Sequence, residues 1–357
     1  MFKKYVFVEK KNLIITSLID FIGSILFFWI KKDKPLGDIK NILVIRVDHI
    51  GDVITTVPSL RALRKAFPKA NISVMVRSLS KDLLMNCPYI NEIIVYDAPW
   101  FHGKKSLNLF KTLSFLRRLR KKNFDLAIDF KADLRNICLA YLSKSRNRLA
   151  YDVKGGGFLL THVASYRRGL IHNVDRSLEV LKKLNIESKD KSLELWIPES
   201  VKKKVKLTNK KFVVIHPGSG GPLKLWSNEG FAQVGDYIIK KYKAEVVLTG
   251  SPDEAYLAND IERFMSFKPL NLAGKTSLLE LAEIIRRAKI FISPDSGPMH
   301  MAVAVKTPTI ELFGTSLSEV WGYKSKNDIL IERKGKDLSG ITPEEVMKAV
   351  DKLWMKK

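Results

Sequence analysis

Three short polar segments carry the side chains best suited to chemistry, and each directly follows an apolar run. They are segments 48–52, 217–222 and 295–300. An apolar strand, a tight turn and a helix start leave backbone N–H groups unpaired at the positive end of a helix dipole, which favours an anion such as a pyrophosphate. In an open α/β sheet, such turns lie at the carboxyl ends of the strands, where ligands bind. Together the segments indicate a nucleotide site, although any one alone could be an ordinary turn capped by a residue such as Ser296.

Composition and charge narrow the classes of partner. The chain has 357 residues, with 62 Lys and Arg against 37 Asp and Glu, and hence a formal net charge of +25. Such an excess attracts anions, and nucleic acid, an acidic membrane or a phosphorylated substrate would all fit. No zinc-finger or RNP sequence occurs, so we expect no nucleic acid partner. Cys87 and Cys138 are the only cysteines, which argues against a disulfide framework or a cysteine zinc site and favours a reducing cytosol.

The amino-terminal run 13–30 is apolar and has a pair of lysines on each side. On a helix, small and polar residues of this run share one stripe: Thr16, Ser17, Asp20, Gly23 and Ser24. We expect an amphipathic helix in the plane of a membrane, with the stripe in water and Phe27, Phe28 and Trp29 in lipid. A membrane-spanning helix, in which Asp20 would be costly, and a helix docked on protein are the alternatives. The flanking lysines and the cysteine usage favour peripheral binding to the cytoplasmic face of the membrane.

Beyond residue 40, apolar runs alternate with helical patterns, which predicts two α/β halves with parallel sheets. The expected strands are 42–47, 72–76, 92–96 and 125–129 in the first half, and 212–215, 244–249, 269–271, 290–292 and 309–312 in the second. Capping boxes predict helices that start after Ser277 and Thr342. Trp226 is expected to pack in a core rather than to stack on a substrate.

Four ordered motifs resemble glycosyltransferase family 9, the lipopolysaccharide heptosyltransferases. The motifs are 41–63, 216–219, 224–226 and 295–300, with further similarity at 148–151, 172–175 and 314–315. The resemblance implies a GT-B architecture, in which two Rossmann-like domains face each other across a cleft. It also implies inverting transfer of heptose from an ADP-linked sugar to the inner core of lipopolysaccharide, without a cofactor or an obligatory metal. The chain contains no Asp-x-Asp sequence, which agrees with the lack of a metal.

The organisation of the chain predicts five parts, and the resemblance implies which domain binds the acceptor and which the donor. These are a membrane-associating segment 1–40, an acceptor-binding Rossmann-like domain 41–190, a linker 191–210, a nucleotide-sugar-binding Rossmann-like domain 211–335 and a C-terminal helix 336–357. The linker is placed where Lys, Ser and Glu are frequent around a short apolar stretch.

Site residues follow from the positions that match the motifs. Asp52 matches the catalytic base, which would deprotonate the acceptor hydroxyl as it attacks the anomeric carbon; a helix N-cap is its structural alternative. The donor-binding residues implied are Ser219, Lys224, Glu254, Asp295, Ser296, Gly297 and His300. The acceptor-binding residues implied are Asp48, Lys131 and Arg135. Surface solvation is the alternative for Lys224, and Glu254 could equally be an exposed loop residue. Asp48 could belong to an Asx turn. No residue is assigned to a metal.

Lys131 departs from the family pattern, where other members have a glutamine. With Arg135, it would suit an anionic glycolipid acceptor. Two other functions fit the same residues less well: a sugar-nucleotide enzyme such as an epimerase, and a non-catalytic protein that binds anionic lipid. A dehydrogenase is disfavoured because the first turn lacks Gly-x-Gly-x-x-Gly.

Overall fold

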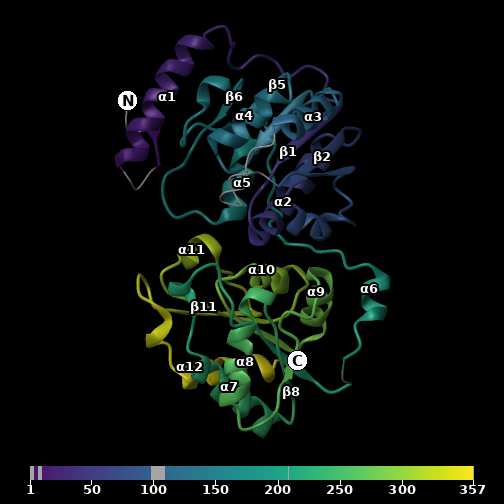
Figure 1. The fold of residues 1–357 in the computed structure, drawn as a ribbon, viewed down its shortest axis with the longest axis vertical. Helices are drawn as coiled ribbons and strands as arrows, with labels where there is room; N and C mark the ends of the chain where they lie inside the picture. Colours follow the sequence, from purple (N-terminus) through teal and green to yellow (C-terminus); the bar gives the residue numbers. More distant parts are fainter. Residues whose placement is uncertain (1–3, 7–9, 98–108, 208, 357) are drawn as a thin grey trace. The chain divides into compact units, whose positions relative to one another are not determined.

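The computed structural model describes residues 4–6, 10–97, 109–207 and 209–356. The chain forms two compact units, and each is built on a six-stranded parallel sheet with helices (Figure 1). Unit 1 comprises Met1–His49, Thr56–Gly169 and Val174–Lys191, and unit 2 comprises Ile50–Thr55, Leu170–Asn173 and Ser192–Lys357. Both units are α/β, as the alternating pattern predicted.

The sheet of unit 1 has the strand order β3-β2-β1-β4-β5-β6. Its strands are β1 (Asn41–Ile45), β2 (Asn71–Val76), β3 (Glu92–Val95), β4 (Leu126–Asp129), β5 (Asn147–Tyr151) and β6 (His162–Ala164). Its helices of nine or more residues are α1 (Lys10–Leu26), α2 (Ile50–Ala66), α3 (Leu109–Arg120), α4 (Leu134–Leu142) and α5 (Asn173–Leu181), although the first residues of α2 and α5 belong to unit 2. The direction of winding reverses between β1 and β4. The ends of these two strands therefore form the switch point at which such sheets bind ligands.

The sheet of unit 2 repeats this topology, with the order β12-β11-β10-β7-β8-β9. Its strands are β7 (Phe212–Ile215), β8 (Glu245–Leu248), β9 (Leu270–Asn271), β10 (Ile290–Pro294), β11 (Thr309–Phe313) and β12 (Asp328–Glu332). Its α-helices are α6 (Glu199–Lys204), α7 (Asn228–Tyr242), α8 (Ala255–Phe264), α9 (Leu278–Arg287), α10 (Gly297–Ala304), α11 (Ser318–Trp321) and α12 (Pro343–Trp354). Here the switch point lies between β7 and β10.

The strands form where branched apolar side chains can be buried on both faces of a sheet. Residues 42–45 of β1 and 290–292 of β10 have no exposed surface. All nine predicted strands are present, within two residues at their ends, whereas β5, β6 and β12 were not predicted. The capping boxes at Ser277 and Thr342 are confirmed. Trp226 is also confirmed as a core residue, and its indole N–H donates to the carbonyl of Ile341 at 3.0 Å.

Helix α1 lies along the outside of unit 1 and packs on the short helix η4 (Gly157–Leu159) (Figure 1). Its polar stripe faces the protein, because four of the five stripe residues are buried and only Ser24 is exposed. The expectation that this stripe stays in water is therefore wrong. Phe27 is also not directed to lipid, since it is half-buried and stacks on Phe158, with the two ring centroids 5.5 Å apart. Within the described residues, no helix combines the length and the hydropathy that a membrane crossing requires.

Candidate active site

The turn after β10 starts helix α10 and contains three of the predicted donor-binding residues: Asp295, Ser296 and Gly297. Ser296 is the N-cap of α10, and its hydroxyl accepts a hydrogen bond from the backbone N–H of Met299. Its Oγ also lies 2.8 Å from Oγ of Ser293. Gly297 is the first helical residue, and a Cβ there would come within 3.1 Å of Ile50, which also belongs to unit 2. A glycine thus allows a close approach at the positive end of a helix, where anions bind.

The loop after β7 meets this turn because β7 and β10 are neighbours at the switch point. The Nζ atom of Lys224 lies 2.6 Å from a carboxylate oxygen of Asp295. The hydroxyl of Ser219 donates to the backbone carbonyl of Asp295 at 2.8 Å. Asp295 is buried, whereas the Lys224 side chain keeps 34% of its surface exposed. The structure therefore brings Ser219 and Lys224 to the predicted anion-binding turn, and Lys224 forms an ion pair instead of being a purely solvated lysine.

His300 lies one turn into α10 and is 3% exposed. Its Nδ1 lies 2.7 Å from the hydroxyl of Tyr323, whose backbone N–H donates to the buried Glu311 at 2.9 Å. Burial is the main cause that lowers the pKa of His300 to about 4, so the imidazole is neutral at pH 7. Burial also raises the pKa of the Tyr323 hydroxyl well above its ordinary value. His300 is therefore a fixed, uncharged hydrogen-bonding group.

Asp52 lies in the first turn of α2, near His300. Helix α2 begins at Ile50 with His49 as its N-cap, so the alternative assignment of Asp52 as N-cap is wrong. The amide of Asn173 donates to Thr55 at 2.8 Å and approaches the Asp52 carboxylate at 3.5 Å. At the preceding residue, a Cβ on Gly51 would lie 2.9 Å from Nε2 of His300. The backbone of Gly51, next to Asp52, therefore packs tightly against the ring of His300 within unit 2.

Glu254 lies against the loop after β7. Its carboxylate completes a capping box by accepting hydrogen bonds from the N–H and the hydroxyl of Ser251, at 3.2 and 2.7 Å. The other carboxylate oxygen would lie 2.5 Å from a Cβ on Gly218. The side chain is half-buried, so simple loop exposure does not describe it.

In unit 1, the switch point between β1 and β4 holds a buried charge cluster. Asp48 is 1% exposed and pairs with Lys131, while Nη1 of Arg46 lies 3.6 Å from its second oxygen. That second oxygen, Oδ2, has no hydrogen-bond donor among the described residues. Nearby, burial raises the pKa of Asp129 to about 6, despite hydrogen bonds from Asn136 and two backbone N–H groups. The cluster therefore joins Asp48 and Lys131, two of the three predicted acceptor-binding residues.

Arg135, the third, has a different partner. Its guanidinium binds both carboxylate oxygens of Asp133, the N-cap of α4, at 2.8 and 2.5 Å. Its side chain remains 47% exposed. An acceptor group would have to share this arginine with Asp133.

Comparison with known proteins decides the family. Residues 112–345 match the model of glycosyltransferase family 9 (heptosyltransferase). The chain belongs to this family. It is 30% identical over 332 residues to lipopolysaccharide heptosyltransferase 3 of Escherichia coli (strain K12), covering 85% of this chain and 95% of that protein.

Solved structures agree with the family 9 assignment. The glycosyl transferase family 9 protein from Veillonella parvula DSM 2008 is 26% identical, has a TM-score of 0.80, and the match covers 90% of this chain and 98% of that chain. The structure of Escherichia coli ADP-heptose lps heptosyltransferase II is 23% identical with a TM-score of 0.76, covering 88% and 98%. These matches confirm the GT-B fold class. Family membership also confirms that the chain is a glycosyltransferase, and does not favour the epimerase or binding-protein alternatives.

Two residues that the structure places at this candidate site were not predicted. Asn173 belongs to the 172–175 similarity, which could have drawn attention to it, but no role was assigned. Tyr323 follows α11 in a stretch without a strand-turn-helix pattern, and nothing in the sequence connects it with His300. Within the described residues, no three His, Cys, Asp or Glu side chains are grouped so that they could hold a metal ion.

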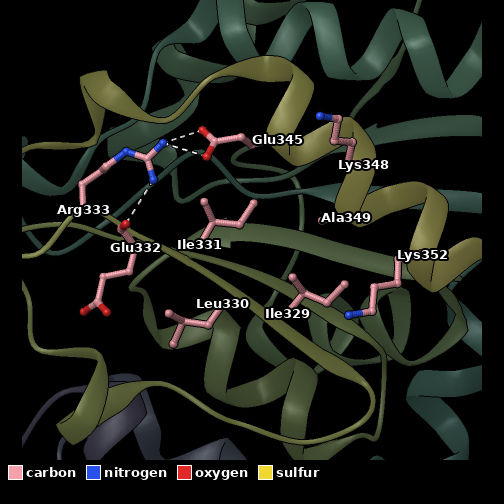
Figure 2. A pocket seen from close by; sticks show the side chains of 9 residues that line it. All are labelled: Ile329, Leu330, Ile331, Glu332, Arg333, Glu345, Lys348, Ala349 and Lys352. Carbon is pink, nitrogen blue, oxygen red and sulfur yellow. Dashed lines mark hydrogen bonds and ion pairs between the residues drawn. The ribbon is translucent and has the colours of Figure 1, made fainter.

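A shallow hollow elsewhere in unit 2 is unrelated to these residues. It lies between β12 and α12, with Arg333 bound to Glu345 at its rim (Figure 2). Its lining is aliphatic and charged, and includes none of the predicted donor-binding residues. We do not assign the family 9 substrates to this hollow.

Proposed function

We propose that this glycosyltransferase transfers heptose from ADP-heptose to the inner core of lipopolysaccharide, with inversion at the anomeric carbon and without a metal. The observation that supports this most directly is the anion-binding arrangement at the unit 2 switch point. There, the N-terminus of α10, Lys224 and Ser219 converge on Asp295. Two of the three relatives named above are named as heptosyltransferases, and one of these two has ADP-heptose in its name.

Asp52 would act as the general base. Its carboxylate takes the proton from the acceptor hydroxyl, the oxygen forms a bond to the anomeric carbon, and the bond from that carbon to the diphosphate breaks with both electrons leaving on the diphosphate. Asn173, which approaches Asp52 and binds Thr55, would hold the first turn of α2 in place. His300 is neutral, so it would assist by hydrogen bonding through Nε2 when Tyr323 donates to Nδ1.

The departing diphosphate carries the negative charge that develops in the reaction. Lys224 would contact its oxygens as a point charge, and the N-terminus of α10 at Ser296 and Gly297 would add oriented dipoles. Glu254 would bind a hydroxyl of the nucleoside ribose. Asp295, once released by Lys224, would accept from hydroxyls of the sugar.

The acceptor would be an anionic glycolipid reached at the cytoplasmic face of the membrane, to which the enzyme binds peripherally. Lys131 and Arg135 would contact its acidic groups, and Asp48 would hold Lys131 in place. Asp48 would therefore orient the acceptor through Lys131, because its own carboxylate is buried.

Transfer of label from ADP-heptose to an extracted core-truncated glycolipid tests this function. The wild-type protein should label the lipid, and labelling should persist in excess EDTA because no metal is required. Asp52→Asn should reduce the rate by about 10²- to 10⁴-fold, the usual contribution of general-base catalysis. The circular dichroism spectrum should stay unchanged, since Asp52 is only partly buried. Full activity of Asp52→Asn would reject the assignment of the base.

A further inference from the structure

Helix α1 and the turn that follows it expose a continuous apolar surface, which we call the α1 apolar face. Ten large apolar side chains form it, and each is between 38% and 80% exposed: Ile14, Ile15, Leu18, Ile19, Phe21, Ile22, Ile25, Leu26, Phe28 and Trp29. Soluble proteins rarely expose so many adjacent apolar side chains, and such a patch marks an interaction surface. The face covers most of the helix circumference, because the buried stripe occupies only one side.

The buried stripe is fastened to unit 1 by specific polar contacts. Asp20 accepts a hydrogen bond from the hydroxyl of Tyr5 at 2.7 Å and from the backbone N–H of Gly156 at 2.8 Å. Nζ of Lys4 lies 2.9 Å from the same carboxylate and also 2.9 Å from Asp152. A buried carboxylate needs such partners, because an unpaired charge would be costly to bury. These contacts direct the polar side of α1 toward the protein.

Glycines allow α1 to approach closely. A Cβ on Gly23 would lie 2.5 Å from the ring of Phe158, and a Cβ on Gly155 would lie 2.5 Å from Thr16. Gly155 also has φ of +87°, a conformation that favours glycine. Phe27 completes the contact by packing on Tyr141 and Phe158. The orientation of α1 therefore rests on a complementary interface and not on chance placement.

We propose that the α1 apolar face inserts into the surface of an anionic lipid bilayer, while the polar stripe stays packed against unit 1. Three features favour lipid as the occupant. Aliphatic side chains cover the helix while Phe28 and Trp29 lie at its end, as in interfacial helices. Lys11 and Lys31 are exposed on either side of the face, where they meet acidic headgroups. The formal charge of +25 attracts the same surface.

This inference deepens the proposed function, because it supplies the contact through which the enzyme would reach a lipid-anchored acceptor. It differs from an ordinary amphipathic anchor, in which the polar side faces water. Here unit 1 packs against the polar side, so unit 1 would lie directly on the membrane surface and would not be tethered to it by a flexible segment.

Sedimentation with vesicles of phosphatidylglycerol and phosphatidylethanolamine tests the proposal with the full-length chain. Wild-type protein should bind these vesicles and bind neutral phosphatidylcholine vesicles more weakly. Combined Ile14→Ser, Leu18→Ser and Ile25→Ser substitutions should weaken binding by about 1,000-fold, since each removes an exposed apolar side chain worth roughly tenfold in partitioning. A matched control carries Leu79→Ser, Phe264→Ser and Met355→Ser, which also replace exposed apolar residues but lie outside α1. The control should bind as the wild type does.

Equal binding by the α1 variant and the control would overturn the proposal. So would a wild-type dimer in lipid-free buffer that the α1 substitutions dissociate, because the face would then be covered by a second copy of the chain. Transfer to a delipidated core oligosaccharide separates this inference from the proposed function. The α1 variant should keep that activity and lose activity on vesicle-bound acceptor, whereas failure of the proposed function would abolish both activities in the wild type.

Discussion

Replacing Gly51 with alanine would test the contact that links the two ends of the proposed catalytic arrangement. A Cβ at this position would lie 2.9 Å from Nε2 of His300 and closer still to Cδ2. An ordinary van der Waals contact needs at least about 3.4 Å, so one side must move by roughly 1 Å. His300 cannot easily yield, because Nδ1 is bound to Tyr323 and the ring packs on Trp321. The first turn of α2, which carries Asp52, should therefore shift.

Two effects follow from that shift. Overpacking of this size costs about 1–3 kcal/mol of the free energy of unfolding. A displacement of about 1 Å at a catalytic group can lower the rate by about 10²-fold. We expect Gly51→Ala to show both effects, measured by urea unfolding and by the initial rate of transfer to a soluble core acceptor. The KM for the ADP-sugar should change less than kcat, because Lys224 and the turn at Ser296 are unaltered.

A control glycine and a second substitution make the result decisive. Gly220→Ala should be neutral in both measurements, because a Cβ there meets no atom within 4 Å. In a background of His300→Ala, Gly51→Ala should cost no further stability, because the clash is removed together with the histidine, and activity should not return. If Gly51→Ala alone matches the wild type in stability and rate, the close approach of His300 to α2 does not exist and the reasoning fails.

Three further predictions concern single side chains. Lys224→Ala should raise the KM for the ADP-sugar by about 10- to 150-fold, because a hydrogen bond to a charged group contributes about 1.5–3 kcal/mol. An unchanged KM in a donor titration would contradict the assignment. Burial raises the pKa of Glu311 to about 8, above its value in the unfolded chain. Its contribution to stability is therefore complete below about pH 4.5 and is lost as the pH rises toward 8. Between pH 5 and 8, the melting temperature of Glu311→Gln should fall less than that of the wild type. If both melting temperatures fall by the same amount, this prediction is wrong. Lys131→Ala should raise the KM for an anionic acceptor but not for the donor, and a selective effect on the donor would refute its placement on the acceptor side.

The sequence predicted most of the fold because its strands are rich in branched apolar residues. The strands that escaped prediction have other reasons to form. Strand β5 contains Asn147 and Arg148, yet it is fully buried, because the guanidinium of Arg148 donates to the carbonyls of Ser145 and Leu159 at 2.6 Å. Strand β6 has only three residues, and β12 is an edge strand with charged ends. In each case the strand forms because it pairs with a neighbouring strand of the sheet, which the local sequence does not reveal.

The candidate site was predictable to the extent that its residues follow strands. Asp48, Lys224 and Asp295 could be found because each lies in the turn or loop that follows a predicted strand. Tyr323 could not, since its partner His300 lies 23 residues earlier and no periodic pattern joins them. The orientation of α1 was mispredicted for the same reason. Asp20 finds its donor at Gly156, 136 residues away, and amphipathicity alone does not say which side meets protein.

In the proposed donor site, the ion pair between Lys224 and Asp295 gives the ammonium group a counter-ion from the same chain. A diphosphate that bound Lys224 would have to displace this carboxylate, so two anions would compete for one ammonium group. A small ion such as sulfate engages few groups and competes poorly against a tethered rival. A nucleotide sugar would also contact the N-terminus of α10, and the displaced carboxylate of Asp295 would then accept hydrogen bonds from sugar hydroxyls. If the proposed roles hold, this competition between Asp295 and the diphosphate for Lys224 would favour the complete donor over its fragments.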